Sequence, residues 1–578
     1  MTNGLTRGGA LIDLILRGGT VVDGTGAPGR LADVAVHDGR IVAVGVVDDS
    51  ATTEIDATGR VVAPGFVDPH THFDAQIMWD PMLAPSSLHG VTSVISGNCG
   101  FTLAPLAPGS AEYLIPMLAR VEGMPEATLR AAIDPDWKTF GEWLDRLEGH
   151  TAVNAGFLVG HSAIRRYVLG DDAVGRTATA AEIQDMVALL HASIDEGGLG
   201  LSTTRSTSHS DHNGDPVPSR FADRDEIMSL CAAVGEHPGT WLELVPSMDR
   251  VFSDETVDVM VSMSVAARRV LNWNLMVVRA GEEERATRLS ELRASDEAKA
   301  RGGRVVALTL PEAMGSRLSF GDAILYDTIT DWHEVMVLPH AEKVAALRDP
   351  RVRRKLAAGV EHDGYRTYTD WASCTIGDVG SAALQPHVGR TVGEIAGDAD
   401  PFETLLDIVV ADDLATGVEP KVIGEDDAAW KERLSLMRDD RVLVGGSDAG
   451  AHLDMMKTFA FSTRFLGHTV RDEHRLRLEE AVHLITDAPA RLFGLRDRGR
   501  IVEGWWADLV VFDPGTIDRG PVRMVHDLPA DGQRLTADAV GIDHVIVNGV
   551  PILEHGRPTG AMPGRVLRSG RDTDTVEV

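Results

Sequence analysis

The chain has 578 residues, of which 43% are hydrophobic, and it carries a formal net charge of −32 with a pI near 5.0. This length allows a large buried core and a second, smaller domain, whereas the negative charge argues against a nucleic-acid partner, because a phosphate backbone requires clustered Lys and Arg. Three scattered cysteines, Cys99, Cys231 and Cys374, exclude a disulfide framework and indicate a reducing compartment.

The first ten residues are rich in glycine and lack an apolar core, so we expect no signal peptide. Further along, no apolar run approaches the ~18–20 residues of a membrane span. These features predict a cytoplasmic protein that acts on a small molecule and contacts neither nucleic acid nor membrane. Self-association into a homo-oligomer stays open.

Both ends of the chain are predicted to be β structure. Residues 12–60 contain apolar runs at 12–16, 34–36 and 41–44, with Asp38-Gly39 between the last two. An Asp-Gly or Asn-Gly pair between apolar runs is a strong hairpin signal. The same pattern recurs around Asn548-Gly549, after a predicted strand at 508–512. We therefore predict one small β domain built from residues 1–63 and 496–578.

The middle of the chain, residues 64–495, alternates predicted helices and strands. Thr179 and Glu182 form a capping-box pattern before a stretch with helical spacing, and a Gly-Gly pair ends that stretch just before an apolar strand. Helix followed promptly by strand favours a parallel α/β fold, in which chemistry lies at the carboxyl ends of strands. A Glu- and Arg-rich segment begins at 281, and we expect a helical excursion near 281–372.

His70 and His72 end an apolar strand that begins near Val61. Side chains two residues apart on a strand point the same way, so two imidazoles at this spacing can bind one metal ion from one side. The alternative for an isolated pair of this kind is two surface histidines at a strand end. The strand before the pair and an acidic motif near Asp448 favour the metal site.

Asp448 follows a second apolar strand, 442–444, and His452 lies four residues beyond it. An aspartate at a strand end can contact a metal and accept a proton from water. The alternative is an aspartate that caps the next turn. Paired with His-x-His in an α/β chain, Asp448 is predicted to be both a metal ligand and the general base.

Two further strands end in residues that could carry chemistry. Cys99 follows the strand 94–96, and a thiolate is a good zinc ligand, although a lone cysteine is more often a core residue. His161 follows the strand 157–159 and could bond a substrate carbonyl, or be satisfied by structural partners instead. Arg165 could receive a substrate carboxylate or pair with a structural acid.

A polar loop at 202–214 follows another strand and contains Arg205, His209 and His212. These side chains are candidates for substrate contacts, because loops positioned by a scaffold often carry function. The alternative, to which we give equal weight, is a solvent-exposed loop that has no role in binding.

Taken together, these motifs resemble a known family. The stretch 63–72, APGFVDPHTH, resembles the signature of the amidohydrolase superfamily. Five further motifs resemble those of its N-acyl-D-amino-acid deacylase (D-aminoacylase) branch. They are GNCGF at 97–101, GHSAIR at 160–165, GLGLS at 198–202, GSD at 446–448 and GWWADLVVF at 504–512. The resemblance extends from about residue 12 to about residue 560.

The resemblance implies a distorted (β/α)8 TIM-type barrel with a small β-sandwich domain formed by both termini. It also implies zinc at His70, His72, Cys99 and Asp448, with Asp448 as the proton-shuttling acid and base. The activity implied is hydrolysis of a non-peptide C–N bond, with an N-acyl D-amino acid as the expected substrate.

The sequence departs from the family pattern at the fifth and sixth strands, where the family has metal-binding histidines. The corresponding stretches, 240–246 and 270–275, contain Glu243 and Asn274 instead. Asparagine is a poor zinc ligand, so the prediction is one zinc ion held by His70, His72 and Asp448, with Cys99 near it. Two ions, or another divalent metal, are the alternatives.

The predicted mechanism is attack of a metal-activated water on the amide carbonyl, with Asp448 as base and then acid and His161 near the oxyanion. Arg165, Arg205, His209, His212, Asn274 and His452 are the candidate substrate contacts. Within hydrolases, the alternative substrate is a cyclic amide or imide. An alternative of another class is a catalytically inactive scaffold that kept the fold.

Overall fold

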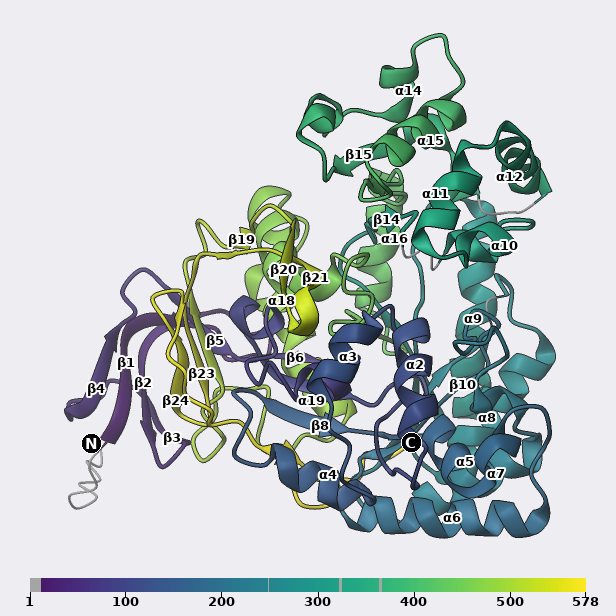
Figure 1. Ribbon diagram of the computed structural model, residues 1–578. Coiled ribbons are helices and arrows are strands. Elements are labelled where there is room, and N and C mark those ends of the chain that lie inside the picture. Colours follow the sequence, from purple (N-terminus) through teal and green to yellow (C-terminus); the bar gives the residue numbers. More distant parts are fainter. Residues whose placement is uncertain (1–11, 248, 322–324, 363–365) are drawn as a thin grey trace.

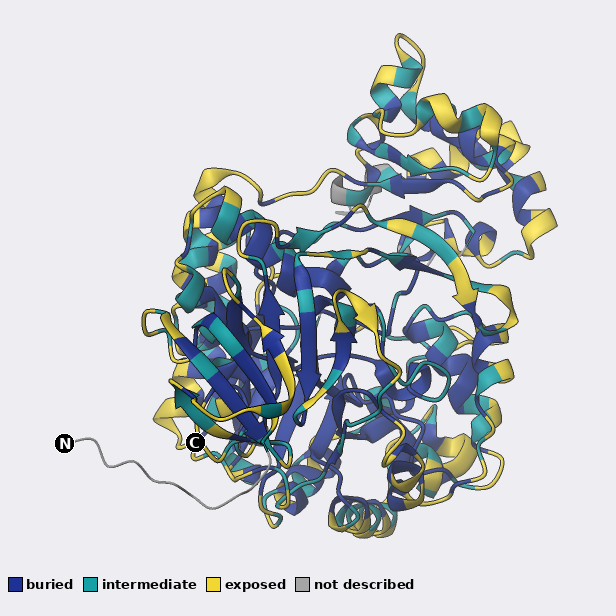
Figure 2. Cartoon of the chain, turned by 90° about the vertical axis from the view of Figure 1, so that its left-hand side faces the viewer, coloured by how far each residue is buried: buried dark blue, intermediate teal, exposed yellow. Residues whose placement is uncertain are grey.

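The computed structural model describes residues 12–247, 249–321, 325–362 and 366–578. In Figure 1, strands from both chain ends gather on one side of the molecule, and the alternating helices and strands of the middle form the main body. A largely helical segment, coloured green, projects from that body. Figure 2 shows buried strands inside the main body, with exposed residues concentrated on outer helices and loops.

One sheet of nine strands contains strands from both ends of the chain. Its order is β25-β24-β23-β18-β5-β1-β2-β3, and β4 pairs with β1. The nine strands are β1 (Ile12–Val21), β2 (Arg30–His37), β3 (Arg40–Gly45), β4 (Ala51–Asp56), β5 (Val61–Pro64), β18 (Leu509–Phe512), β23 (Ile542–Val547), β24 (Val550–Glu554) and β25 (Arg557–Pro558). The two ends meet where β5 pairs antiparallel with β18, with Ala63 opposite Val510. Strands from the two ends of the chain therefore share one sheet.

The two predicted hairpins are also confirmed. Strands β2 and β3 pair antiparallel up to His37 and Arg40, and β23 pairs with β24 in the same way. Asp38 and Asn548 have φ angles of 49° and 46°, and the glycine after each is also left-handed. This tight turn needs two residues with positive φ, a conformation that Asp-Gly and Asn-Gly tolerate.

The strands of the middle form two parallel sheets, β26-β8-β7-β6 and β17-β13-β12-β11-β10-β9. Their residues are almost entirely buried, as expected when helices cover a parallel sheet. The strands are β6 (Phe66–Asp68), β7 (Val91–Ser96), β8 (Asn154–Phe157), β9 (Val159–Gly160), β10 (Gly200–Thr204), β11 (Trp241–Val245), β12 (Val270–Trp273), β13 (Arg304–Thr309), β17 (Val442–Val444) and β26 (Val566–Leu567). Apart from β26, neighbours in each sheet follow chain order, so the predicted parallel α/β organisation is confirmed.

Helices connect these strands. The main ones are α2 (Ala111–Val121), α4 (Phe140–Leu147), α5 (His161–Leu169), α6 (Ala180–Asp195), α7 (Arg224–Val234), α8 (Asp254–Ala267), α9 (Glu282–Ala300), α16 (Asp427–Met437), α18 (Leu478–Ile485) and α19 (Asp487–Leu492). Helix α6 begins with the predicted capping box, in which the Thr179 side chain accepts from the Glu182 backbone and the Glu182 side chain accepts from Thr179. Among the described residues, no helix has the length and apolar content needed to cross a membrane.

The excursion expected near 281–372 differs in its limits from the segment that the structure sets apart. Helix α9 connects β12 to β13, packs against α8, and buries Leu292 and Ala294. It therefore belongs with the helices that cover the parallel sheet, and most of its charged residues are exposed, although Arg288 and Glu291 are buried. The separate segment begins after β13.

This segment, from about 310 to 425, has a hydrophobic core of its own. Strands β14 (Leu318–Ser319), β15 (Thr375–Asp378) and β16 (Gly417–Glu419) form a three-stranded sheet. Helices α11 (His340–Arg348), α12 (Pro350–His362) and α15 (Pro401–Ala411) lie beside it. The rings of Trp332 and Trp371 stack with centroids 5.9 Å apart. The chain then returns through α16 to β17, so an insertion with its own core divides β13 from β17.

Candidate metal centre

His70 and His72 follow β6, where the backbone stays in an extended, paired conformation. Thr71, between them, donates its N–H to the Ile95 carbonyl at 2.9 Å and forms a parallel bridge with Ala449. The His72 N–H donates to the Ala449 carbonyl at 2.7 Å. Because the backbone is held from both sides, alternation turns both imidazoles to one side. Both rings are buried, as a site shielded from water requires.

Cys99 and Asp448 reach the same place from turns that follow β7 and β17. Both residues have left-handed backbone, with φ angles of 59° and 54°. For residues other than glycine, this conformation costs roughly 1–2 kcal/mol and is concentrated at functional sites. The Cys99 N–H donates to Glu243 Oε2 at 2.8 Å, and the Asp448 N–H donates to the His70 carbonyl at 3.2 Å. These bonds fix the two turns against the strands.

The four side chains bring their donor atoms together, and we call His70, His72, Cys99 and Asp448 the donor cluster. Cys99 Sγ lies 3.5 Å from His70 Nε2 and 3.7 Å from His72 Nε2. Asp448 Oδ1 lies 3.2 Å and 3.7 Å from the same two nitrogens. Ligands at zinc-bonding distances of about 2.0–2.3 Å in a tetrahedron are about 3.3–3.8 Å apart. These four distances lie at or near this range, and the ligand atoms of His70, His72 and Cys99 all lie within 4.8 Å of one another. These three side chains form a group that can bind a metal, with Asp448 beside the two histidines, and imidazole, thiolate and carboxylate are ligands that zinc accepts.

The charges around the donor cluster also favour a cation. Burial, together with the charges of Glu243 and Glu122, raises the pKa of the Cys99 thiol well above its usual value. Burial alone would raise the pKa of Asp448, but hydrogen bonds with His70 and His72 and their positive charges lower it instead. Asp448 is therefore ionised, whereas Cys99 needs a neighbouring cation to become a thiolate.

Two buried glutamates lie behind the histidines. Glu122 Oε1 is 3.4 Å from His72 Nδ1, and Glu243 Oε1 is 3.9 Å from His70 Nδ1. Burial raises the pKa of Glu122 to about 7 and that of Glu243 to about 8. A metal ion in the donor cluster would counter this burial cost by attracting the carboxylate forms.

His161 and Arg165 have their hydrogen-bond partners outside the donor cluster. His161 Nδ1 pairs with the Thr203 hydroxyl at 2.9 Å, and its Nε2 pairs with Glu226 at 2.8 Å. Arg165 forms an ion pair with the same glutamate and donates to the Arg176 carbonyl at 2.9 Å. All three charged side chains are fully buried. The roles predicted for His161 at the oxyanion and for Arg165 at a substrate carboxylate are not supported by these contacts, because both groups are engaged by one structural acid.

Asn274, His209 and His452 do lie by the donor cluster. Asn274 Nδ2 donates to Asp448 Oδ1 at 3.3 Å. Burial and the charge of nearby His452 lower the pKa of His209 to about 3, and burial lowers the pKa of His452 to about 4. Both imidazoles are therefore neutral near pH 7, and neither buried Nδ1 has a hydrogen-bond partner within the protein. Such nitrogens are available to a ligand.

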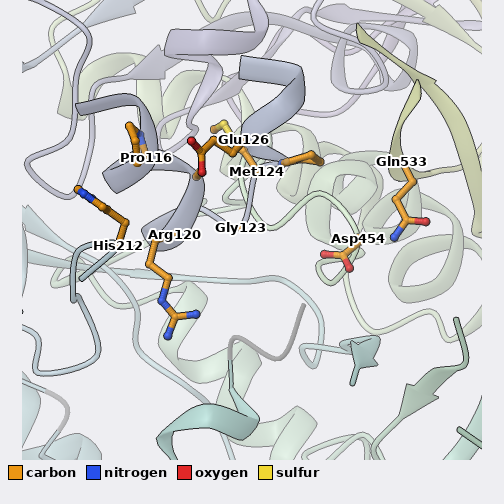
Figure 3. Close-up of a pocket in the computed structure, with 10 residues that line it drawn as sticks. Pro116, Arg120, Gly123, Met124, Glu126, His212, Asp454 and Gln533 are labelled. Atoms are coloured by element: carbon orange, nitrogen blue, oxygen red, sulfur yellow. The ribbon is translucent and has the colours of Figure 1, made fainter. Parts of the chain in front are cut away.

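Arg205 and His212 lie farther out. Arg205 pairs with Glu255 at 3.4 Å and is 36% exposed along its side chain. His212 is exposed and packs edge-on against the Tyr113 ring. It also lines a cavity of about 320 Å³, together with Arg120, Asp454 and Gln533. Figure 3 shows this cavity between the turn that follows α2 and the segments that carry Asp454 and Gln533.

The residues that line the cavity include none of the donor cluster, but two of them flank Glu122 in the chain. Arg120 and Gly123 line it, and Glu122, between them, lies beside His72. Arg120 also forms an ion pair with Asp327 of the insertion. The cavity therefore lies beside the end of α2, whose residues contact both His72 and the insertion.

No sequence motif pointed to Glu122 or Glu226. Glu122 ends a helix that has no motif, and Glu226 resembles an ordinary first-turn acid of α7, whose Asp223 caps the helix. The sequence offered one general clue to both acids: a buried histidine or arginine requires a hydrogen-bond acceptor. That rule does not say which of the 87 acidic residues supplies it.

The chain matches the model of the Amidohydrolase family over residues 53–553. It is 30% identical to a D-aminoacylase of Alcaligenes xylosoxydans xylosoxydans over 535 residues, which is 91% of each chain. It is 27% identical to an N-acyl-D-glutamate deacylase of the same organism, covering 90% of this chain and 88% of that one.

Solved structures agree with these matches. A D-aminoacylase crystal structure, described as defining a novel subset of amidohydrolases, has a TM-score of 0.64 at 28% identity and covers 96% of this chain and 100% of that chain. An N-acyl-D-glutamate deacylase from Bordetella bronchiseptica, complexed with zinc and a phosphonate mimic of the tetrahedral intermediate, gives 0.64 at 25% identity, covering 97% and 100%. A D-hydantoinase from Bacillus sp. AR9, at 16% identity and a TM-score of 0.51, is alike in fold alone and covers 98% and 100%.

Proposed function

The chain belongs to the amidohydrolase family, and from this premise we propose that it is a metal-dependent hydrolase that removes the acyl group from an N-acyl D-amino acid. The observation that carries the proposal is the donor cluster, in which the ligand atoms of His70, His72 and Cys99 lie within 4.8 Å of one another and Asp448 Oδ1 lies 3.2 Å from His70 Nε2. The relatives named as deacylases support the substrate class.

We further propose that the two parallel sheets are parts of one distorted (β/α)8 barrel. The strands from β6 to β17 follow chain order around both sheets, and the bridge between Thr71 and Ala449 joins the ends of β6 and β17. The nine-stranded sheet would belong to a β-sandwich domain of residues 1–63 and 496–578, with residues 64–495 as the catalytic domain. All donor-cluster residues follow the carboxyl ends of strands, where such barrels carry their active sites.

In this proposal His70, His72 and Cys99 hold one zinc ion, and Asp448 is the fourth donor. The histidine side chains are 0% and 4% exposed, whereas that of Asp448 is 16% exposed. A catalytic zinc site keeps one position for water or substrate. The exposed Asp448 is therefore the donor best placed to exchange a metal contact for a water molecule.

Bound zinc would polarise the amide carbonyl and lower the pKa of water toward ~7. Asp448 accepts the proton of the water that attacks the carbonyl carbon. As the C–N bond breaks, Asp448 returns this proton to the nitrogen, which yields a carboxylic acid and a free amino acid. Asn274 Nδ2, which donates to Asp448 Oδ1, holds the carboxylate in position during both transfers.

His209 and His452 are proposed to contact the substrate. Both are neutral near pH 7, and each has a buried Nδ1 without a partner in the protein. A neutral imidazole can donate one hydrogen bond to a carbonyl oxygen that gains negative charge. The adjoining cavity of about 320 Å³ would take the remainder of the substrate.

The test is a substrate panel on zinc-loaded protein. N-acetyl-D-amino acids, their L-enantiomers and cyclic imides are incubated with the enzyme, and the release of free amine or ring opening is measured. We expect amine release from the D-series, and metal analysis should give about one ion per chain.

If only cyclic imides were turned over, the protein would still be a hydrolase, but the proposed substrate class would be wrong. Protein that neither binds zinc nor turns over any substrate would contradict the proposal and favour an inactive scaffold. The same panel on Asp448→Asn is the control for contaminating hydrolases.

A further inference from the structure

Each histidine of the donor cluster has a buried glutamate at the ring nitrogen that points away from the other donors. Both histidines approach Cys99 and Asp448 through Nε2. On the other side of each ring, His70 Nδ1 faces Glu243 and His72 Nδ1 faces Glu122. A hydrogen bond at one ring nitrogen decides which nitrogen remains for a metal.

Glu122 is placed by the end of α2. It is the last residue of the helix turn, and its N–H donates to the Leu118 carbonyl at 2.9 Å. Its side chain is only 4% exposed, and its Oε1, which has no hydrogen-bond partner, faces His72 Nδ1 at 3.4 Å. A buried acid that faces a single imidazole is explained by a role toward that imidazole.

Glu243 lies on β11 and contacts two members of the donor cluster. Its Oε2 accepts from the Cys99 N–H at 2.8 Å, and its Oε1 faces His70 Nδ1 at 3.9 Å. Both facing atoms, Glu243 Oε1 and His70 Nδ1, are buried and have no hydrogen-bond partner within the protein. Glu243 therefore fixes the turn that carries Cys99 and faces the rear of the His70 ring.

The same contacts argue against Glu243 as a metal ligand. One of its oxygens is bound to a backbone N–H, and the other approaches His70 at Nδ1 rather than at Nε2. The metal position lies on the Nε2 side, because that atom is 3.2–3.5 Å from Asp448 Oδ1 and Cys99 Sγ. A carboxylate behind the ring cannot also bind the ion in front of it.

We propose that Glu122 and Glu243 are positioning residues that hold His72 and His70 with Nε2 toward the metal, and that the chain consequently carries a one-ion centre. The proposal rests on the metal centre of the proposed function. It assigns Glu243 to the support of a ligand, although the family resemblance places a ligand at this strand. Loss of such a partner typically lowers metal affinity 10–100-fold.

The experiment measures zinc affinity by competition with a chelator, without any assay of turnover. Glu122→Ala and Glu243→Ala should each weaken zinc binding about 10–100-fold, and the Gln variants should recover part of the loss, because an amide oxygen still accepts from Nδ1–H. Glu291→Gln is the matched control, because Glu291 is a buried acid on α9, outside the donor cluster. The zinc affinity of this variant should equal that of wild type.

Melting of each metal-free variant shows whether it is folded, and the Gln variants keep the test informative if an Ala variant is not. Wild type and both Glu243 variants should bind one ion per chain. Two ions in wild type and one in Glu243→Ala would make Glu243 a ligand and overturn the inference, as would unchanged affinity in all four variants. Absence of zinc binding by wild type would instead contradict the proposed function.

Discussion

The donor cluster and the group formed by His161, Arg165, Thr203 and Glu226, which we call the Glu226 group, begin from similar sequence patterns. In both, histidines follow a buried strand of the parallel sheets, and in both the charged side chains are withdrawn from water. In the Glu226 group, both ring nitrogens of His161 find partners at 2.8–2.9 Å. In the donor cluster, the Nε2 atoms meet only other potential metal donors at 3.2–3.7 Å.

This difference separates a structural polar group from a binding site. Buried polar groups are normally satisfied within the protein, and the Glu226 group follows that rule. In the donor cluster the contacts run among imidazole, thiol and carboxylate groups that can all bind a metal, so a cation can take the place of these contacts. A strand-end histidine therefore indicates chemistry only when its neighbours are donors of the same kind.

Among single substitutions in the two groups, one in the donor cluster should have the largest effect, which is on turnover. Asp448→Asn keeps a side chain of the same shape but removes the base, so kcat should fall about 10²–10⁴-fold. His70, His72 and Cys99 remain, and the variant should still contain about one zinc ion per chain with a near-normal melting temperature. Steady-state kinetics and metal analysis check this, and turnover within tenfold of wild type would exclude Asp448 as the base.

The Glu226 group should respond in stability rather than in metal binding. Glu226→Gln leaves the buried Arg165 guanidinium without its counter-charge, and breaking a buried pair typically costs about 3–5 kcal/mol of the free energy of unfolding. Zinc affinity should be unchanged. Urea unfolding and chelator competition measure the two quantities.

The control for this variant is Glu255→Gln, because Glu255 pairs with Arg205 at the surface and its side chain is 78% exposed. An exposed pair of this kind contributes about 0–1 kcal/mol. If Glu226→Gln lost zinc affinity with stability intact, the contrast between the two groups would be wrong.

The smallest expected effect is the pH dependence of the difference in unfolding free energy between wild type and Glu226→Gln. Burial alone would raise the pKa of Glu226, but hydrogen bonds and charges from His161 and Arg165 lower it below 4.5. A carboxyl group whose pKa is lower in the folded state stabilises the fold above its unfolded pKa, and loses that contribution as the pH falls through its folded pKa. The stability difference between wild type and Glu226→Gln should therefore be constant near pH 6 and shrink below about pH 4. Urea unfolding across this range tests the sign, and a difference that grows with acid would contradict it.

Local signals in the sequence accounted for much of the fold. The capping box at Thr179 and the hairpin turns at Asp38 and Asn548 were predicted, since each depends on residues within a few positions of one another. The start of the insertion was not, because the charged α9 differs from a solvated excursion only through its packing on α8.

By itself, the sequence determined the alternation that turns His70 and His72 to one side, the strand ends that carry Cys99 and Asp448, and the family resemblance. Only the tertiary structure decided which buried polar atoms find partners. Glu226 meets His161 across 65 positions of the chain, and Glu243 meets Cys99 across 144. Propensity and spacing describe neighbours along the chain, whereas hydrogen-bond satisfaction in a dry interior depends on what the fold places opposite each group.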